Sequence, residues 1–329
     1  MTATSSSAPM STGDNSSETR VAADFPEETP QVSVVITTYN HARFLDESIS
    51  SAVAQEGAGI EVLVVDDGSQ DDPATVVARY PGVRMVSQPN QGLPAARNTG
   101  LREARGTFVQ FLDADDRLLP GAIAQNLASF AARPECALAH GSYRSVDSKW
   151  RPIWQPEPFR LDADPLGSLL ENGNRIGVPA AVMYRRECLI AIGGFDSSLK
   201  ANEDYDVYLR LAQRYPMTSN TAVVAEYRYH GDNMSGNATL MLTSGLRVLA
   251  SQRTAASAKP AWTKALRGGE RHMRSHWIRA QFRQLRDALR SRRNVGRATA
   301  ATARLVAAAP LSVARECLIL CVEALRGRR

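Results

Sequence analysis

The sequence predicts an α/β protein with a mostly parallel β-sheet flanked by helices, followed by a C-terminal helical extension. Between residues 32 and 132, apolar runs rich in β-branched residues alternate four times with segments of helical periodicity. Polar residues gather where these runs end, at the sheet edge where open parallel sheets bind ligands. From about residue 240 onward the pattern becomes helical and strongly basic.

The first half of the chain contains four strand–helix pairs. Near-continuous apolar runs are typical of strands that are buried on both faces of a sheet. They predict strands at 32–40, 61–69, 83–89 and 107–112. Apolar residues at helical spacing predict helices at 42–55, 74–80, 92–105 and 120–132. Right-handed crossovers between the strands then give a parallel sheet.

The second half of the α/β region has a mixed pattern. Residues 136–147 predict a strand that enters a hairpin, and residues 180–196 a strand, a short helix and a glycine turn. Residues 203–215 predict an amphipathic helix, and residues 222–230 another strand. The sheet therefore continues beyond the four strand–helix pairs.

The charge is distributed unevenly along the chain. Residues 240–329 hold 19 Lys and Arg and 4 Asp and Glu, whereas the rest holds 20 and 30. A mildly acidic body therefore carries a basic helical region. The positive electrostatic field of this region favours an anionic partner such as a membrane surface. The same charge pattern is also typical of an Arg-rich helical face that is exposed to solvent. No recognition motif supports nucleic acid as the partner.

The last helical segment, residues 310–329, is amphipathic. It is compatible with lying on a membrane surface and with packing on the body, where it would bury Leu318, Ile319 and Val322. Packing is the favoured interpretation. No segment reaches 18 uncharged apolar residues, so we predict no transmembrane helix.

The first 29 residues are rich in Ser, Thr, Ala and acidic residues. They lack a basic segment followed by an apolar one, so they predict a disordered tail over 1–30 and no secretory signal. The four cysteines are sparse and form no Cys-x-x-Cys pair, which favours reduced thiols. We therefore expect a cytoplasmic protein, with the inner face of the plasma membrane as an alternative.

The sequence FLDADD ends the predicted strand at 107–112 with Asp113, Asp115 and Asp116. Side chains two apart in an extended segment point the same way, so Asp113 and Asp115 are expected to share a site. Converging carboxylates suit Mg²⁺ or Mn²⁺, which also bind substrate phosphates. Helix capping is the alternative, and it accounts for one aspartate, Asp116.

Other polar residues admit two interpretations each. Asp67 fits either a turn or a carboxylate that binds a nucleobase or ribose. Arg97, one turn into a predicted helix, fits either an anion contact or a surface position. Glu203 and Asp204 fit either helix-dipole stabilisation or a general base. His230 fits a metal ligand, a phosphate contact or a structural role. No G-x-G-x-x-G or P-loop motif is present, which disfavours an oxidoreductase and a P-loop NTPase.

Seven segments together resemble family 2 inverting glycosyltransferases, which have the A-type nucleotide-diphospho-sugar transferase fold. They span residues 32–235 in order and read VSVVITTYN, VVDDGSQDD, NQGLPAARNTGL, FVQFLDADD, GGFD, NEDYDVYLRLA and YRYHGDNMS. The resemblance implies a catalytic domain over 31–238 and a basic helical region over 239–329. It implies transfer of a sugar from a nucleoside-diphosphate sugar, most simply a UDP-sugar, to an acceptor hydroxyl.

The resemblance also implies which residues bind the donor. Thr37, Tyr39 and Asp67 match positions that hold the nucleoside, and Asn40 adjoins them. Arg97 matches a position near the base or the diphosphate. These residues all follow predicted strands or open a predicted helix.

The remaining matches concern the metal and the chemistry. Asp113 and Asp115 match the metal-binding Asp-x-Asp motif, with Asp113 also near the nucleotide, and His230 matches a position that completes the metal or diphosphate site. Mg²⁺ or Mn²⁺ is the implied cofactor. Asp204 matches the catalytic base, and Glu203 is the next candidate.

The sequence departs from processive family members. It lacks their Gln-x-x-Arg-Trp motif and their transmembrane helices, so one sugar per binding event is expected, in polysaccharide or glycoconjugate synthesis. Residues 141–180, with Trp150 and Trp154, match no motif and are expected to shape the site of a glycan, lipid-linked or other acceptor. The alternatives are a nucleotidyltransferase, disfavoured because no glycine-rich loop follows the first strand, and a non-catalytic nucleotide-sugar or glycan-binding module.

Overall fold

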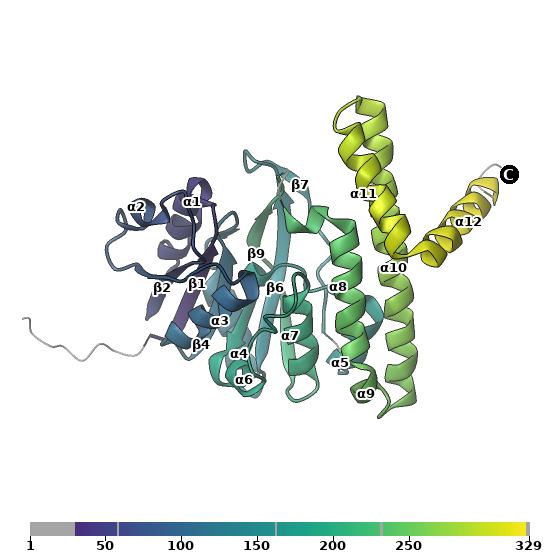
Figure 1. Ribbon diagram of the computed structural model, residues 1–329. Coiled ribbons are helices and arrows are strands. Elements are labelled where there is room, and N and C mark those ends of the chain that lie inside the picture. Colours follow the sequence, from purple (N-terminus) through teal and green to yellow (C-terminus); the bar gives the residue numbers. More distant parts are fainter. Residues whose placement is uncertain (1–29, 58, 162, 231–232, 327–329) are drawn as a thin grey trace, which may run out of the picture.

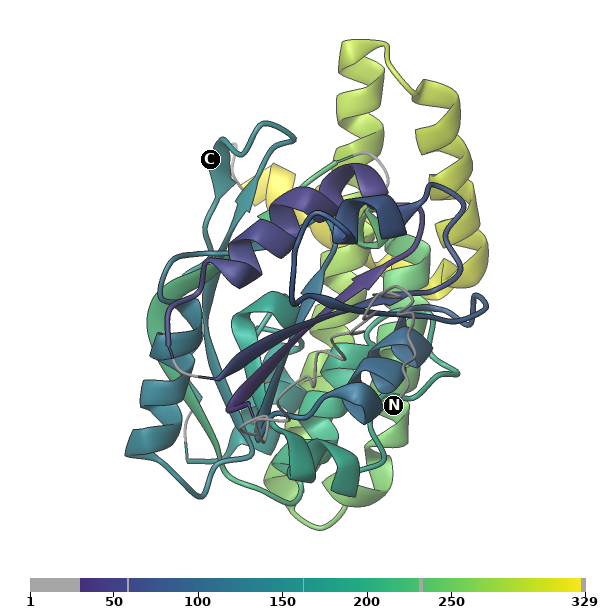
Figure 2. The same ribbon diagram turned by 90° about the vertical axis from the view of Figure 1, so that its left-hand side faces the viewer.

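The computed structural model describes residues 30–57, 59–161, 163–230 and 233–326 (Figure 1). The predicted tail over residues 1–29 lies outside the described residues. Within them, a mixed nine-stranded sheet has the order β3-β2-β1-β4-β8-β6-β9-β5, and β7 pairs with β6. Figure 2 shows the twist of this sheet, which follows from the right-handed twist of its strands.

The predicted strand–helix alternation is confirmed. Its parallel strands are β1 (Val32–Thr38), β2 (Ile60–Asp66), β3 (Arg84–Ser87) and β4 (Phe108–Asp113). Its helices are α1 (Ala42–Val53), α2 (Pro73–Val77), α3 (Leu93–Glu103) and α4 (Ala122–Ala132). Every residue of β1 is buried, as expected for a strand covered on both faces.

The second half of the sheet is mostly antiparallel. Its strands are β5 (Arg117–Leu118), β6 (Leu138–Val146), β7 (Pro152–Trp154), β8 (Val182–Arg185) and β9 (Met217–Arg228). Its helices are α5 (Pro165–Asn172), α6 (Arg186–Ala191) and α7 (Glu203–Ala212), with short 3₁₀ turns η1 (Pro179–Ala181) and η2 (Met234–Gly236). The predicted hairpin after residue 136 is β6–β7, and β9 begins earlier than expected.

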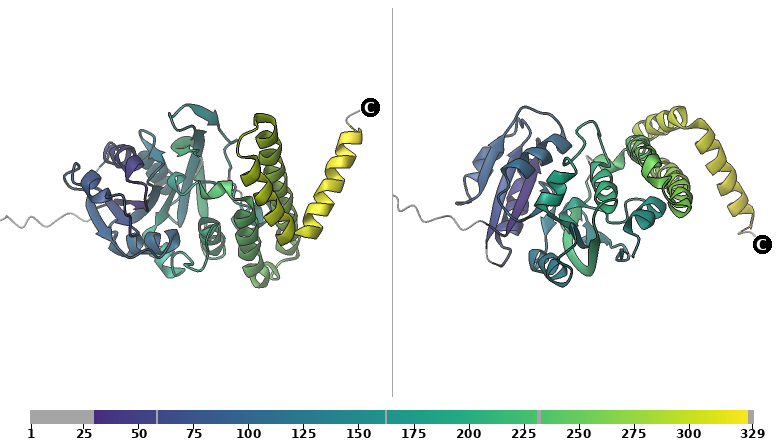
Figure 3. Two further views of the ribbon diagram at one scale, coloured as in Figure 1. Left: turned by 45° about the horizontal axis from the view of Figure 1, so that its top comes forward. Right: turned by 90° about the horizontal axis from the view of Figure 1, so that it is seen from below.

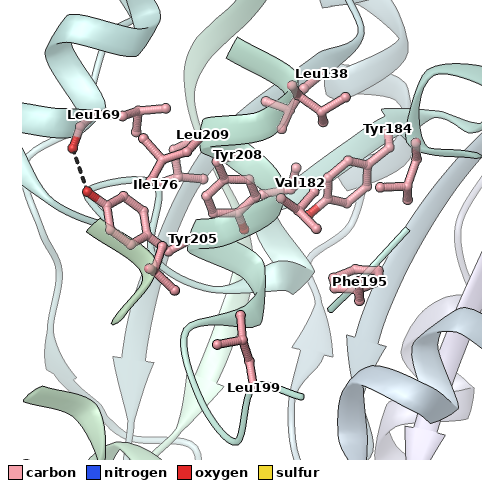
Figure 4. Close-up of a cluster of buried hydrophobic side chains, with 14 of the residues drawn as sticks. Leu138, Leu169, Ile176, Val182, Tyr184, Phe195, Leu199, Tyr205, Tyr208 and Leu209 are labelled. Atoms are coloured by element: carbon pink, nitrogen blue, oxygen red, sulfur yellow. Dashed lines mark hydrogen bonds between the residues drawn. The ribbon is translucent and has the colours of Figure 1, made fainter. Parts of the chain in front are cut away.

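Two hydrophobic layers cover the sheet. On one face, α1, α2 and α4 pack against alternate residues of β1, including Val34 and Ile36. On the other, α3, α6 and α7 pack against the intervening residues, including Val35. Figure 4 shows part of this second layer, in which the Tyr205 hydroxyl donates a hydrogen bond to the carbonyl oxygen of Leu169 at 2.8 Å. The layer fixes the start of α7 against the sheet.

The C-terminal helices extend this second layer. They are α8 (Ala238–Ser251), α9 (Arg253–Ala256), α10 (Pro260–Ser291), α11 (Val295–Ala308) and α12 (Pro310–Arg326). Leu266, Met273 and Ile278 of α10 belong to the same hydrophobic cluster as Leu166 and Leu169 of α5. Helix α10 therefore shares its core with the α/β region.

Helices α5 and α10 approach closely at Gly269. A Cβ atom at this position would lie 1.9 Å from the carbonyl oxygen of Leu170, so only glycine fits there. The predicted boundary between residues 238 and 239 falls at the first residue of α8 and stays a prediction.

One expectation about the last helix is wrong. Leu318 was expected to be buried against the body, but it is 67% exposed, because Val313 (7% exposed) and Glu316 occupy the packed side of α12 instead. Val322 lies among the side chains that the structure does not describe. In the described part of the chain, no helix combines the length and apolarity that a membrane crossing requires.

Candidate functional site

A deep cleft opens at the carboxyl ends of the parallel strands. Its volume is about 1530 Å³, above the roughly 300–1,000 Å³ of most small-ligand pockets. One side comes from the ends of β1 and β4 and the start of α3, and the opposite side from β7 and α10. The start of α7 also contributes.

Most of the predicted site residues line this cleft. They are Thr37, Tyr39, Asp67, Arg97, Asp113, Asp115, Glu203 and Asp204. His230 joins them by contacting Asp115. Asn40 is exposed and does not line the cleft; it has a positive φ of 54°, and its side-chain oxygen accepts a hydrogen bond from the Gln70 amide at 2.8 Å. Asn40 therefore ties the loop after β1 to the loop after β2.

Sheet register brings the first two polar positions together. Thr37 of β1 is paired with Asp113 of β4, and its hydroxyl donates a hydrogen bond to Asp113 Oδ1 at 3.3 Å. The same register sets Thr38 beside Asp66 of β2. Parallel pairing thus places the strand-end residues at one edge, as the sequence predicted.

Arg97 links the strand edge to the start of α7. Its side chain is 1% exposed; one terminal nitrogen donates to Asp113 Oδ1 at 2.8 Å and the other to Glu203 Oε1 at 2.5 Å. Burial opposes the charge, but the two carboxylates outweigh it and raise the pKa of Arg97. The guanidinium therefore stays charged and pairs with two carboxylates at once, which leaves the three groups with a net negative charge.

Asp204 sits beside this bridge without an ion pair of its own among the described residues. Its carboxylate accepts hydrogen bonds from the Tyr205 amide at 2.7 Å and the Asn174 side-chain amide at 2.8 Å. Burial and the adjacent Glu203 charge raise the pKa of Asp204 to about 7, although Arg97 opposes the shift. A carboxyl group that titrates near neutrality in a cleft is suited to proton transfer.

Asp115 contacts two imidazoles. The Nε2 atom of His230 lies 2.8 Å from Asp115 Oδ2, and the Nδ1 atom of His41 lies 3.9 Å from the same oxygen. In the described ranges, no three His, Cys, Asp or Glu side chains converge as a ready set of metal ligands. The carboxylate of Asp115 and the imidazole of His230 are still suitable ligands for a divalent cation that completes its coordination with substrate phosphates and water.

Asp116 does not cap the following helix. Helix α4 begins at Ala122 with Gly121 as its N-cap, because β5 intervenes between the aspartates and the helix. Asp116 turns inward and accepts a hydrogen bond from the Arg228 amide at 2.9 Å. Burial and the neighbouring aspartates raise its pKa well above the usual range. The capping interpretation of Asp116 is therefore wrong, and the residue anchors β9.

Asp67 holds the loop that leads into α3. Its Oδ1 accepts hydrogen bonds from the Gln88 side chain at 2.7 Å and the Gln91 amide at 2.9 Å, and its Oδ2 accepts one from the Gly92 amide at 2.8 Å. The carboxylate lines the cleft and orients the start of the helix that carries Arg97. Its lone pairs also leave acceptor capacity for a ligand.

Trp150 is a site-supporting residue that no sequence motif identified. Its ring lies between two guanidinium groups, with Arg117 Cζ 3.9 Å and Arg228 Cζ 3.8 Å from the ring centre. Its indole N–H donates to Glu47 at 2.9 Å. The backbone of Trp150 has a φ of 60°, a left-handed conformation that is unfavourable for residues with a side chain. The contacts of its ring therefore stabilise a strained backbone.

The stack continues from Trp150 to the cleft. Arg228 also lies over the ring of Phe44, at 4.6 Å, and that ring stacks on His230 with centroids 5.2 Å apart. Stacking on both sides of Arg228 thus reaches the imidazole that contacts Asp115. Only the tertiary structure reveals this, because the residues come from distant parts of the chain.

The far wall of the cleft combines part of residues 141–180, which were expected to shape an acceptor site, with a part of α10 that was not expected there. It is formed by Ile153 and Trp154 of β7, both 56% exposed, and by residues of α10. His272, His276 and Arg283 are spaced by four and seven residues, which places them on one side of α10. The basic composition of this region was visible in the sequence, but its return to the cleft was not.

Comparison with known proteins shows similarity to one family. Residues 33–193 match the family described as glycosyl transferase family 2. An uncharacterized protein of Mycobacterium tuberculosis is 36% identical over 201 residues, which cover 56% of this chain and 63% of the relative. The chain thus spans less than two thirds of that relative's length.

Solved structures share the fold at low sequence identity. TarS of S. aureus, in a complex with UDP-GlcNAc, has a TM-score of 0.59 at 17% identity and covers 76% of this chain and 81% of its own. The mannosyltransferase PcManGT of Pyrobaculum calidifontis, in a complex with GDP-Man and Mn²⁺, has a TM-score of 0.58 at 20% identity. The match covers 91% of this chain and 82% of the mannosyltransferase. These similarities confirm the predicted A-type fold.

We expect Trp150→Ala to lower the free energy of unfolding by about 2–4 kcal/mol, because it removes two cation–π contacts and a hydrogen bond to a carboxylate. Chemical denaturation measures the change. Trp154→Ala is the matched control: its ring is 56% exposed, and it should change stability by less than about 0.5 kcal/mol. If both substitutions lowered the free energy of unfolding equally, the contacts of Trp150 with the two arginines and Glu47 would not contribute to stability.

Proposed function

Because residues 33–193 match glycosyl transferase family 2, we propose that the chain transfers one sugar from a nucleoside-diphosphate sugar to an acceptor hydroxyl with inversion at the anomeric carbon. The observation that carries this proposal is the state of Asp204. It is a buried cleft carboxylate with a pKa of about 7, next to a Glu203 that is ion-paired with Arg97.

In this mechanism Asp204 is the general base. It takes the proton of the acceptor hydroxyl while the hydroxyl oxygen attacks the anomeric carbon. The bond from that carbon to the diphosphate oxygen breaks on the opposite face, and its electron pair leaves with the nucleoside diphosphate. Glu203 is the second candidate base, but its ion pair with Arg97 assigns it a positioning role.

Thr37, Tyr39, Asp67 and Arg97 are proposed to bind the nucleoside and diphosphate, with Asp113. Tyr39 is 47% exposed at the cleft and offers a ring face to a base. Asn40, outside the cleft, contributes by holding the adjoining loops together. A UDP-sugar is the proposed donor; the structural neighbours were solved with UDP-GlcNAc and with GDP-Man.

Asp115 and His230 are proposed to hold Mg²⁺ or Mn²⁺ together with Asp113. A carboxylate and an imidazole 2.8 Å apart fit the donor set of such an ion, and a structural neighbour was solved with Mn²⁺. When bound, the cation offsets negative charge on the leaving diphosphate. Arg97 supplies a permanent positive charge at the same end of the cleft.

The acceptor is proposed to bind between β7 and α10, where Trp154 presents an exposed ring of the kind that stacks on sugars. The cleft is open on this side, and transfer of a single sugar per binding event is proposed. We propose that the protein acts in the cytoplasm, in the synthesis of a cell-surface polysaccharide or glycoconjugate.

Asp204→Asn should preserve donor binding but lower turnover by about 10²–10⁴-fold, because the amide has the shape of the carboxylate without its basicity. Calorimetry with UDP measures binding, and a screen of nucleotide sugars for donor hydrolysis or transfer measures turnover. Near-normal turnover in this variant would move the base elsewhere.

The pH profile is the control for that assignment. The base must be deprotonated, so native turnover should fall about tenfold per unit as the pH drops below about 7, and level off above it. The residual turnover of Asp204→Asn should lack this acid limb. An unchanged limb in the variant would assign it to another group.

Asp115→Ala should abolish the Mn²⁺-dependent part of nucleoside-diphosphate binding, because it removes the carboxylate that faces His230. Calorimetric titrations of UDP with and without Mn²⁺ measure this part directly. Asp46→Ala, a half-exposed carboxylate outside the cleft, is the matched control and should leave both titrations unchanged. If Mn²⁺ strengthens UDP binding equally in native protein and Asp115→Ala, the metal assignment fails.

A further inference from the structure

Helix α12 presents an apolar and basic side that no described residue covers. Leu311 is 86% and Leu318 67% exposed, and Arg315 is exposed between them. Spacings of four and seven residues place the three on one side of the helix, which we call the outer face of α12. Leucines this exposed are unusual on a helix that otherwise packs against a protein body.

The opposite side of α12 fixes its orientation. Val313 is 7% exposed and belongs to the main hydrophobic cluster. Glu316 is buried, pairs with Arg279 of α10 and accepts a hydrogen bond from the Ser275 hydroxyl at 3.1 Å. The helix is therefore anchored along one side, and its outer face stays turned away from α10.

The helical region that carries the outer face is strongly basic. Residues 240–329 carry a net charge of +15. Many cations of α10–α12 have no ion-pair partner among the described residues, and they are Lys264, Arg267, Arg271, Arg283, Arg290, Arg292, Arg293, Arg297, Arg304 and Arg315. Unpaired cations attract an anionic surface, and each contributes when it comes within a Debye length of that surface.

We propose that the outer face of α12, with the arginines of α11 and α12, docks the protein on an anionic lipid bilayer. Arg315 flanked by Leu311 and Leu318 suits the headgroup boundary, where leucines enter the acyl layer and arginine meets phosphates. Nucleic acid would engage the arginines but would leave the leucines in water, so lipid fits the pattern better.

The position of α12 is compatible with a working enzyme. Helix α12 lies on the side of α10 that is remote from the sheet and extends outward beyond the body (Figures 1 and 3). The cleft, by contrast, lies between the sheet and α10. Docking through the outer face of α12 therefore leaves the cleft open for both substrates.

Co-sedimentation of the full chain with vesicles tests this proposal without any sugar donor. We expect binding to equimolar phosphatidylcholine and phosphatidylglycerol, and at least tenfold weaker binding to phosphatidylcholine alone. The double variant Arg304→Gln and Arg315→Gln should bind the anionic vesicles roughly 30-fold more weakly, at about 1 kcal/mol per arginine. Leu311→Ser with Leu318→Ser should weaken binding about tenfold at any salt concentration.

Matched surface substitutions control for nonspecific effects. Ile190→Ser and Arg79→Gln change an exposed apolar residue and an exposed arginine of the α/β region, and should leave vesicle binding unchanged. Thermal unfolding checks that every variant folds. The proposal is overturned if binding is equal on both vesicles, if the leucine variant binds like the native chain, or if these variants weaken only nucleic-acid binding or self-association.

Discussion

The buried guanidinium of Arg97 holds the whole candidate site together. It joins Asp113, at the end of a parallel strand, to Glu203, at the start of a helix ninety residues later in the chain. Burying one cation between two carboxylates is favourable only if all three stay paired, since an isolated buried charge destabilises the fold by several kcal/mol. The donor end of the cleft and the start of α7 are therefore constrained to form together.

The contacts of Arg97 leave the acidic residues of the cleft in different environments. Asp113 and Glu203 share the ion pair with Arg97, and Asp115 faces His230. Asp204 is left with hydrogen bonds but no described ion pair, and burial beside Glu203 raises its pKa to about 7. One carboxylate is thus able to exchange a proton near neutrality while the others bind or position. Trp150 supports the same arrangement from outside, through the stack that ends at His230.

The amino-acid sequence alone predicts the parts of this site that depend on the local pattern of apolar and polar residues. Parallel pairing follows from strand–helix alternation, so the pattern of residues alone places Thr37 and Asp113 at one edge of the sheet. Contacts between segments far apart in the chain leave no local signal. The Arg97–Glu203 ion pair, the inward turn of Asp116 and the placement of His272 and His276 of α10 in the cleft wall belong to this second kind. The hairpin that carries Trp150 was predicted, but its contacts with Arg228 and Glu47 were not.

The central claim is that Asp204 acts as a base in a single displacement, so no covalent sugar intermediate forms. The most direct measurement is the anomeric configuration of the first-formed sugar when the protein hydrolyses an α-linked nucleoside-diphosphate sugar, followed by NMR before mutarotation. Inversion predicts the β-anomer as the first product. The α-anomer as the first product would contradict the account, because net retention requires a second displacement or a front-face attack that this assignment of Asp204 does not provide.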